Sequence, residues 1–145
     1  PPAAAPAPVI GEGTTGAPYR LREIPYARRL PAGALGSSLS GYAGCGEHEG
    51  AAPEAVFRVR VEAPTRLWAS AYGFGAIAPR IFLLGEEPRP DACLATAEGD
   101  SVLALEAPGV YHIVVEAEPR RLSRDEAAPE NPGMLFVLTA EGSAR

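Results

Sequence analysis

The stretch "AVFRVRVEA" at residues 55–63 decides the fold class, because apolar and charged side chains alternate along it. On an extended chain, alternate side chains point to opposite faces, so this period of two predicts a β-strand with one buried and one wet face. The apolar face carries Phe57, Val59 and Val61, and the charged face carries Arg58, Arg60 and Glu62.

Similar strand signals recur along the chain at the spacing of a sandwich, separated by turns rich in Gly and Pro. The chain contains 16 Gly and 16 Pro, which argues against a helical bundle. We therefore expect an all-β fold, a two-sheet antiparallel sandwich over residues 19–145, with Tyr111, Ile113 and Val115 or their alternates in its core. The expected strands cover residues 65–73, 79–85, 100–109, 110–118 and 133–142, with two short ones on either side of Pro25.

Charge and hydropathy exclude two classes of partner. All 13 basic residues are Arg, the net charge is −5, and the basic residues are scattered along the chain. Phosphate binding needs a concentrated positive patch, so nucleic acid is not an expected partner. No apolar run reaches the roughly 18 residues of a membrane span.

The first 18 residues, "PPAAAPAPVIGEGTTGAP", have a Pro/Ala-rich composition that favours an extended conformation. Such a segment could pair with the sheet edge of a neighbouring subunit and so build a homopolymer. It could equally pack along its own domain or be held by a lattice neighbour. Under the first alternative, the residues expected at the subunit interface are Val9, Ile10, Tyr19, Leu21 and Ile24.

The segment "GYAGCGEHEG" at residues 41–50 places a cysteine beside two carboxylates and a histidine. The two cysteines of the chain, Cys45 and Cys93, permit one disulfide, which would contribute about 4 kcal/mol in the loop-entropy treatment. Two separate buried thiols are the alternative. The "EHE" triplet is interpreted as a polar turn rather than a metal site, because the only other histidine, His112, lies far along the chain. We expect no metal and no cofactor.

From about residue 44 to residue 139, the chain resembles the bacterial pre-peptidase C-terminal domain family. The resemblance rests on "GCGE" (44–47), "PEAVFRVRV" (53–61), "RIFLLG" followed by Cys93, the hairpin "LEAPGVYHIVV" (105–115) and the last strand "GMLFVLT" (133–139). It implies a secreted, jelly-roll-like β-sandwich without catalytic residues, usually attached to exported proteases or surface proteins. The stretch "AYGFGAIAPRIF" (71–82) has no acidic residue where that family often carries a calcium-binding loop.

Catalysis is not expected, because no serine lies in a nucleophile-elbow context and His112 within "VYHIVV" is interpreted as a strand residue rather than a base. Trp68, Tyr72 and Phe74 lie close together around "LWASAYGFG". If these three side chains are exposed on one face, they could stack on sugar rings; the alternative is that Trp68 and Tyr72 belong to the core or to an interface.

The sequence thus predicts a non-catalytic extracellular structural or adhesion module at the cell surface. The first hypothesis is a surface filament subunit that polymerises by donating its N-terminal strand to a neighbour. The alternatives are an accessory module of a larger secreted hydrolase or lipoprotein, and a carbohydrate-binding module that contacts polysaccharide.

Overall fold

A computed structural model describes residues 11–37, 39, 42–45, 52–125 and 131–141. The described chain folds into two packed β-sheets without an α-helix, so the predicted all-β sandwich is confirmed. Two short 3-10 turns interrupt the strands, η1 (Ala32–Ala34) and η2 (Pro90–Ala92), and no described helix could cross a membrane. The strands are β1 (Tyr19–Leu21), β2 (Tyr26–Pro31), β3 (Glu54–Val61), β4 (Thr65–Phe74), β5 (Ile77–Leu84), β6 (Cys93–Glu98), β7 (Asp100–Leu105), β8 (Gly109–Pro119) and β9 (Gly133–Ala140).

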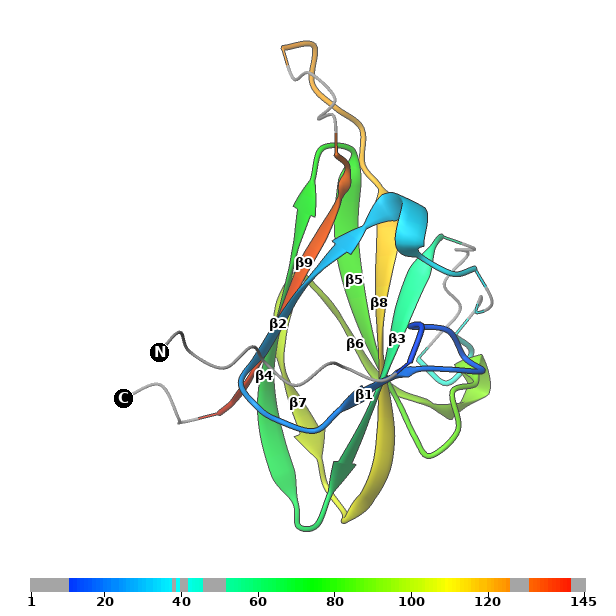
Figure 1. Ribbon diagram of the computed structural model, residues 1–145, viewed down its shortest axis with the longest axis vertical. Coiled ribbons are helices and arrows are strands. Elements are labelled where there is room, and N and C mark those ends of the chain that lie inside the picture. Colours follow the sequence, from blue (N-terminus) through cyan, green and yellow to red (C-terminus); the bar gives the residue numbers. More distant parts are fainter. Residues whose placement is uncertain (1–10, 38, 40–41, 46–51, 126–130, 142–145) are drawn as a thin grey trace, which may run out of the picture.

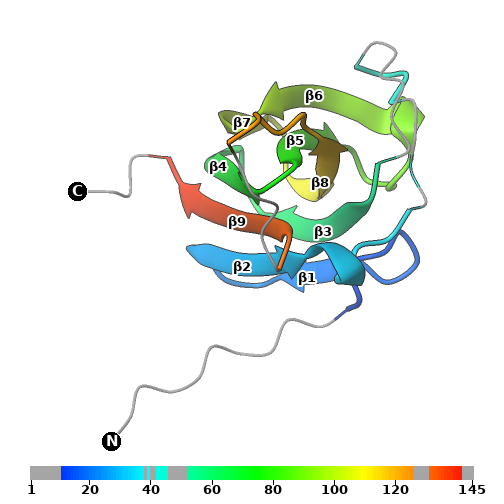
Figure 2. The same cartoon turned by 90° about the horizontal axis from the view of Figure 1, so that it is seen from above.

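One sheet has the strand order β1-β3-β8-β5-β6, and the other has the order β2-β9-β4-β7. Seen from above, the sheets form two facing arcs, with β1 and β2 at one side and β6 and β7 at the other (Figure 2). All strand pairs are antiparallel except β1 and β3, which run parallel. The chain segment from β1 to β2 crosses from one sheet to the other (Figure 1).

The main core fills the space between the sheets. Phe57 on β3 lies at its centre, with the rings of Tyr19, Tyr26 and Phe136 at centroid distances of 5.3, 5.9 and 4.8 Å. Tilted and edge-on aromatic contacts at such distances add to the stability gained from burying the rings. Three residues of β8 were predicted to lie in the core, and all three are buried here: Tyr111, Ile113 and Val115.

A second, smaller core lies outside the five-stranded sheet, where the loop between η1 and β3 covers it. The Tyr42 ring stacks on Phe82 of β5 with centroids 3.7 Å apart, and both side chains are fully buried. The disulfide between Cys45 and Cys93 ties this loop to the start of β6. The cluster consists of Leu39, Tyr42, Val56, Phe82, Leu84, Cys93 and Val114.

The strands predicted after residue 54 match the observed limits to within two residues, except that β7 ends at Leu105 rather than at residue 109, and β6 was not predicted. This strand, "CLATAE", is an edge strand with only its first residue buried. Because few of its side chains enter a core, its sequence lacks the alternation that marks the other strands.

Candidate functional site

The outer face of the four-stranded sheet carries an exposed group of apolar side chains, which we call the aromatic face. Its main residues are Trp68, Tyr72 and Phe74, at alternate positions of β4 and with 43%, 55% and 37% of their surface exposed. Leu135 of β9 lies opposite Tyr72, and Val102 of β7 lies opposite Trp68. The other side of β4, with Leu67, Ala69 and Ala71, enters the core.

The alternation of β4 places the three aromatic residues on one side, as the carbohydrate-binding hypothesis requires. The hypothesis also requires that these three side chains be exposed. The sequence does not determine their exposure, and in the structure all three are exposed. A large exposed apolar group of this kind usually marks a binding surface rather than a neutral part of a protein surface.

Polar contacts hold the two ends of the aromatic face. The Trp68 indole Nε1 donates a hydrogen bond to the Ser70 hydroxyl at 3.1 Å, which restricts the orientation of the indole. At the other end, the Arg29 guanidinium lies over the Phe74 ring at 5.4 Å and donates a hydrogen bond to the carbonyl of Asn131 at 3.1 Å. Fixed side chains lose little conformational freedom when a ligand binds, which favours affinity.

Hydrogen-bonding groups border the aromatic face. Asp100 of β7 lies directly opposite Ser70 and is exposed. Arg66 precedes Trp68 by two positions on the same face of β4 and forms an ion pair with Glu141. The arrangement combines flat apolar rings with charged groups at the rim, which suits a ligand that has both apolar faces and hydroxyl groups.

The predicted subunit-interface residues lie partly within the chain's own core. Tyr19 and Leu21 on β1 are buried and pair with Phe57 and Val59 of β3, and Ile24 is half-buried against the same core. Val9 and Ile10 lie outside the described residues. Strand donation to a neighbour therefore stays a prediction, and in this structure the segment after residue 18 completes its own sandwich.

The "GYAGCGEHEG" segment contributes half of the disulfide, and Cys45 and Cys93 are joined with 2.00 Å between their sulfur atoms. Glu47, His48 and Glu49 lie outside the described residues. Within the described part of the chain, no cluster of three or more His, Cys, Asp or Glu residues could hold a metal ion.

Two buried carboxylates beneath the disulfide loop were not predicted from the sequence. Glu54 of β3 and Glu116 of β8 lie directly opposite each other, and both are almost completely buried. The Glu54 Oε1 atom accepts a hydrogen bond from the backbone N–H of Leu39 at 2.7 Å. Neither oxygen of Glu116 accepts a hydrogen bond of ordinary length from the described residues.

Burial raises the pKa of Glu116 to about 7, because the ionised carboxylate would lose its hydration. The nearby Tyr42 hydroxyl opposes this rise, whereas the charges of Glu118 and Glu54 add to it. Burial, together with the charges of Glu116 and Glu54, also raises the pKa of Tyr42.

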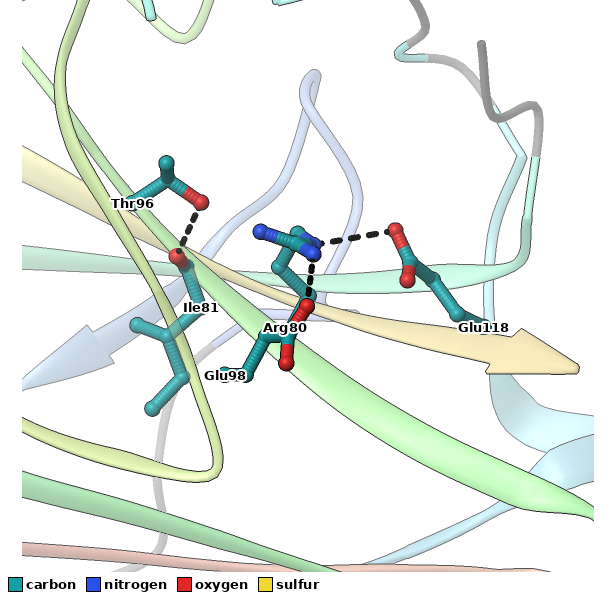
Figure 3. A network of polar contacts seen from close by, with 5 residues as sticks. All are labelled: Arg80, Ile81, Thr96, Glu98 and Glu118. Atoms are coloured by element: carbon teal, nitrogen blue, oxygen red, sulfur yellow. Dashed lines mark hydrogen bonds and ion pairs between the residues drawn. The ribbon is translucent and has the colours of Figure 1, made fainter. Parts of the chain in front are cut away.

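Arg80 of β5 lies opposite Glu116 in the sheet but pairs with two other carboxylates (Figure 3). Its guanidinium forms ion pairs with Glu98 of β6 and with Glu118 of β8, the latter at 3.2 Å. Because the Arg80 guanidinium pairs with Glu98 and Glu118, Glu116 has no salt bridge in the described part of the chain. The register of β5 against β6 and β8 determines which carboxylates lie near Arg80, and the sequence does not reveal this register.

No family model matches the chain, and no curated protein is significantly similar to it. The resemblance to the pre-peptidase C-terminal domain family accordingly stays a prediction.

Proposed function

We propose that this chain is a non-catalytic extracellular binding module that holds an extended carbohydrate chain against its aromatic face. The observation that carries the proposal is the exposure of Trp68, Tyr72 and Phe74 on one side of a single strand. A pyranose ring has an apolar face that can stack on an aromatic ring and hydroxyl groups that can bond to a polar rim.

The dimensions of β4 favour a ligand of several sugar units. With a rise of about 3.3 Å per residue, Trp68 and Tyr72 are about 13 Å apart along the strand, and Tyr72 and Phe74 about 7 Å apart. Rings spaced over this length on a sheet face can contact successive units of a polysaccharide. The disulfide between Cys45 and Cys93 supports an extracellular location, since such bonds persist in oxidising compartments.

Strand-mediated polymerisation has less support than carbohydrate binding. Two of its predicted interface residues, Tyr19 and Leu21, already lie in the chain's own core. An accessory module of a secreted hydrolase remains compatible with the proposal, because such a module can bring an enzyme to a polysaccharide.

The test is a binding assay of the full chain against cellulose, chitin, xylan and soluble β-glucan, by co-sedimentation and affinity electrophoresis. Replacing Trp68 by Ala removes the largest stacking surface and should weaken binding about tenfold or more. Tyr72→Ala should also weaken binding. The matched control is Leu94→Ala, which removes an exposed apolar side chain from β6 in the other sheet and should leave binding unchanged.

Thermal unfolding should stay cooperative in these variants, because none of the replaced side chains belongs to either core. Failure of every polysaccharide to bind would overturn the proposal. Sedimentation velocity adds a second criterion: if the chain self-associates and Trp68→Ala abolishes that association, the aromatic face is a protein interface and the carbohydrate proposal is wrong.

A further inference from the structure

A second concave region lies on the outer face of the five-stranded sheet, independent of the aromatic face. It is an open pocket of about 540 Å³. One wall is the loop of residues 11–18, the opposite wall is the segment 86–88 after β5, and the floor includes Arg20, Arg58 and His112.

The three floor residues form a row across three neighbouring strands. Arg20 of β1 lies directly opposite Arg58 of β3, and Arg58 lies directly opposite His112 of β8. Neighbouring strands are about 4.8 Å apart, so the row places three nitrogen-bearing side chains within a width of about 10 Å. Their charges and hydrogen-bond donors can therefore act on a single small group.

This row has no acidic partner in the described part of the chain. Neither Arg20 nor Arg58 has a carboxylate within ion-pair distance there, although Arg60, two positions further along β3, pairs with Glu62 at 3.4 Å. Like charges directly opposite each other in a sheet destabilise it. An anionic ligand bound between the two guanidinium groups would relieve this repulsion.

His112 is buried, and its Nδ1 atom lies 3.0 Å from the carbonyl oxygen of Gly85. Because a carbonyl only accepts hydrogen bonds, Nδ1 carries the proton in this contact, which leaves Nε2 as the ring nitrogen available to the pocket. Burial lowers the pKa of His112, and the charge of Arg58 lowers it further. The ring can therefore gain a proton when a negative charge arrives beside it.

The loop wall of the pocket is fixed before any ligand binds. The backbone N–H groups of Glu12, Gly13 and Thr14 all donate to the carbonyl of Ala17, at 2.8, 3.0 and 3.3 Å. The Gly13 carbonyl accepts a hydrogen bond from the N–H of Val56 at 2.8 Å, which attaches the loop to β3. Because this loop is already ordered, it loses little conformational entropy when a ligand binds.

We propose that Arg20, Arg58 and His112 form a binding site for an oxyanion group of the carboxylate, sulfate or phosphate class. Guanidinium groups match the geometry of these anions and form charge-assisted hydrogen bonds with them. Glu86 and Glu87 line the opposite wall, and Glu87 pairs with Arg89 at 3.1 Å. These carboxylates repel a bare anion, so a ligand that also carries hydroxyl groups fits the pocket better.

The test is calorimetric titration of the full chain with sodium sulfate, sodium phosphate and glucuronate at constant ionic strength. Arg58→Gln should weaken binding of the probe about tenfold or more, because a charge-assisted hydrogen bond is lost. Arg20→Gln should have an effect in the same direction. The matched control is Arg60→Gln on the same face of β3, which should leave the affinity unchanged.

The pH dependence gives a second readout. Sulfate stays fully ionised between pH 6 and pH 8, so tighter binding at pH 6 reports proton uptake by the protein. The charged groups around His112 in the pocket are Arg20, Arg58, Glu86 and Glu87; Glu116 of β8, whose pKa is raised to about 7, does not line the pocket. His112→Gln should remove the difference between the two pH values.

The probes also distinguish the source of the anion. Binding of glucuronate alone identifies an acidic sugar, and binding of sulfate or phosphate as well identifies a general oxyanion site; both results support the proposal. Absence of binding by all three probes overturns it. Equal losses in Arg58→Gln and Arg60→Gln also overturn it, because they would show attraction by net charge rather than a site.

Discussion

The buried carboxyl group of Glu116 predicts that this protein loses stability as the pH rises. Its pKa increases from an ordinary value of 4.5 to about 7 in the folded protein. Since one pH unit corresponds to about 1.36 kcal/mol, ionised Glu116 costs the folded state up to about 3 kcal/mol relative to the unfolded chain. The contribution of the protonated group is complete below pH 4.5 and is lost as the pH rises through 7. Glu116→Gln mimics the protonated group and cannot ionise, so this variant should avoid the loss.

The assay is urea unfolding of the oxidised protein at several pH values from 4.5 to 8.5. Glu116→Gln should match the unchanged protein at pH 4.5 and exceed its free energy of unfolding by up to about 3 kcal/mol above pH 7. The lowered pKa of His112 acts in the opposite direction in both proteins, so it cancels in the difference. Glu62→Gln, at an exposed position, is the control and should show no such difference. A difference between Glu116→Gln and the unchanged protein that stays constant with pH would refute the reasoning.

Two further predictions concern single covalent and polar contacts. Replacing Cys45 and Cys93 together by Ser should lower the free energy of unfolding by about 4 kcal/mol, because the bond closes a loop with a sequence separation of 48 residues; a reducing agent should destabilise the unchanged protein and not the variant. Tyr111→Phe should lower it by about 1–3 kcal/mol, because the hydroxyl donates to the carbonyl of Ala107 at 2.8 Å and accepts from its N–H at 3.1 Å. Tyr72→Phe, which changes an exposed ring, should have no effect in the same unfolding assay, and equal losses in the two Tyr variants would contradict the role given to the Tyr111 hydroxyl.

The sequence pattern predicts the strands well where one face of a strand is buried and the other is wet. The alternation at Phe57 and Val59 is of this kind, and both residues lie in the main core. The pattern fails for Glu54 and Glu116, which occupy the outward positions of their strands. The disulfide loop covers that side of the sheet and buries both residues. The alternation of apolar and polar residues predicts which face of a strand a side chain lies on, but it does not predict whether another segment covers that face.

The same limit applies to both candidate sites. The spacing of Trp68, Tyr72 and Phe74 predicts a common side of β4, whereas their exposure depends on the absence of a covering element in the described structure. The row of Arg20, Arg58 and His112 depends on the register of three strands that are far apart in sequence. One of those pairings is parallel, and no local motif in the sequence marks it.

The place of β9 in the middle of the four-stranded sheet determines when the domain can fold during its synthesis. β2 and β4 both pair with β9 and not with each other, and β9 is the last of the described strands in the order of synthesis. Until then, β2 has no neighbouring strand in its sheet, and the main core lacks Met134, Phe136 and Leu138. The four-stranded sheet consequently cannot be completed before β9 has been synthesised, and its formation depends on contacts between distant parts of the sequence.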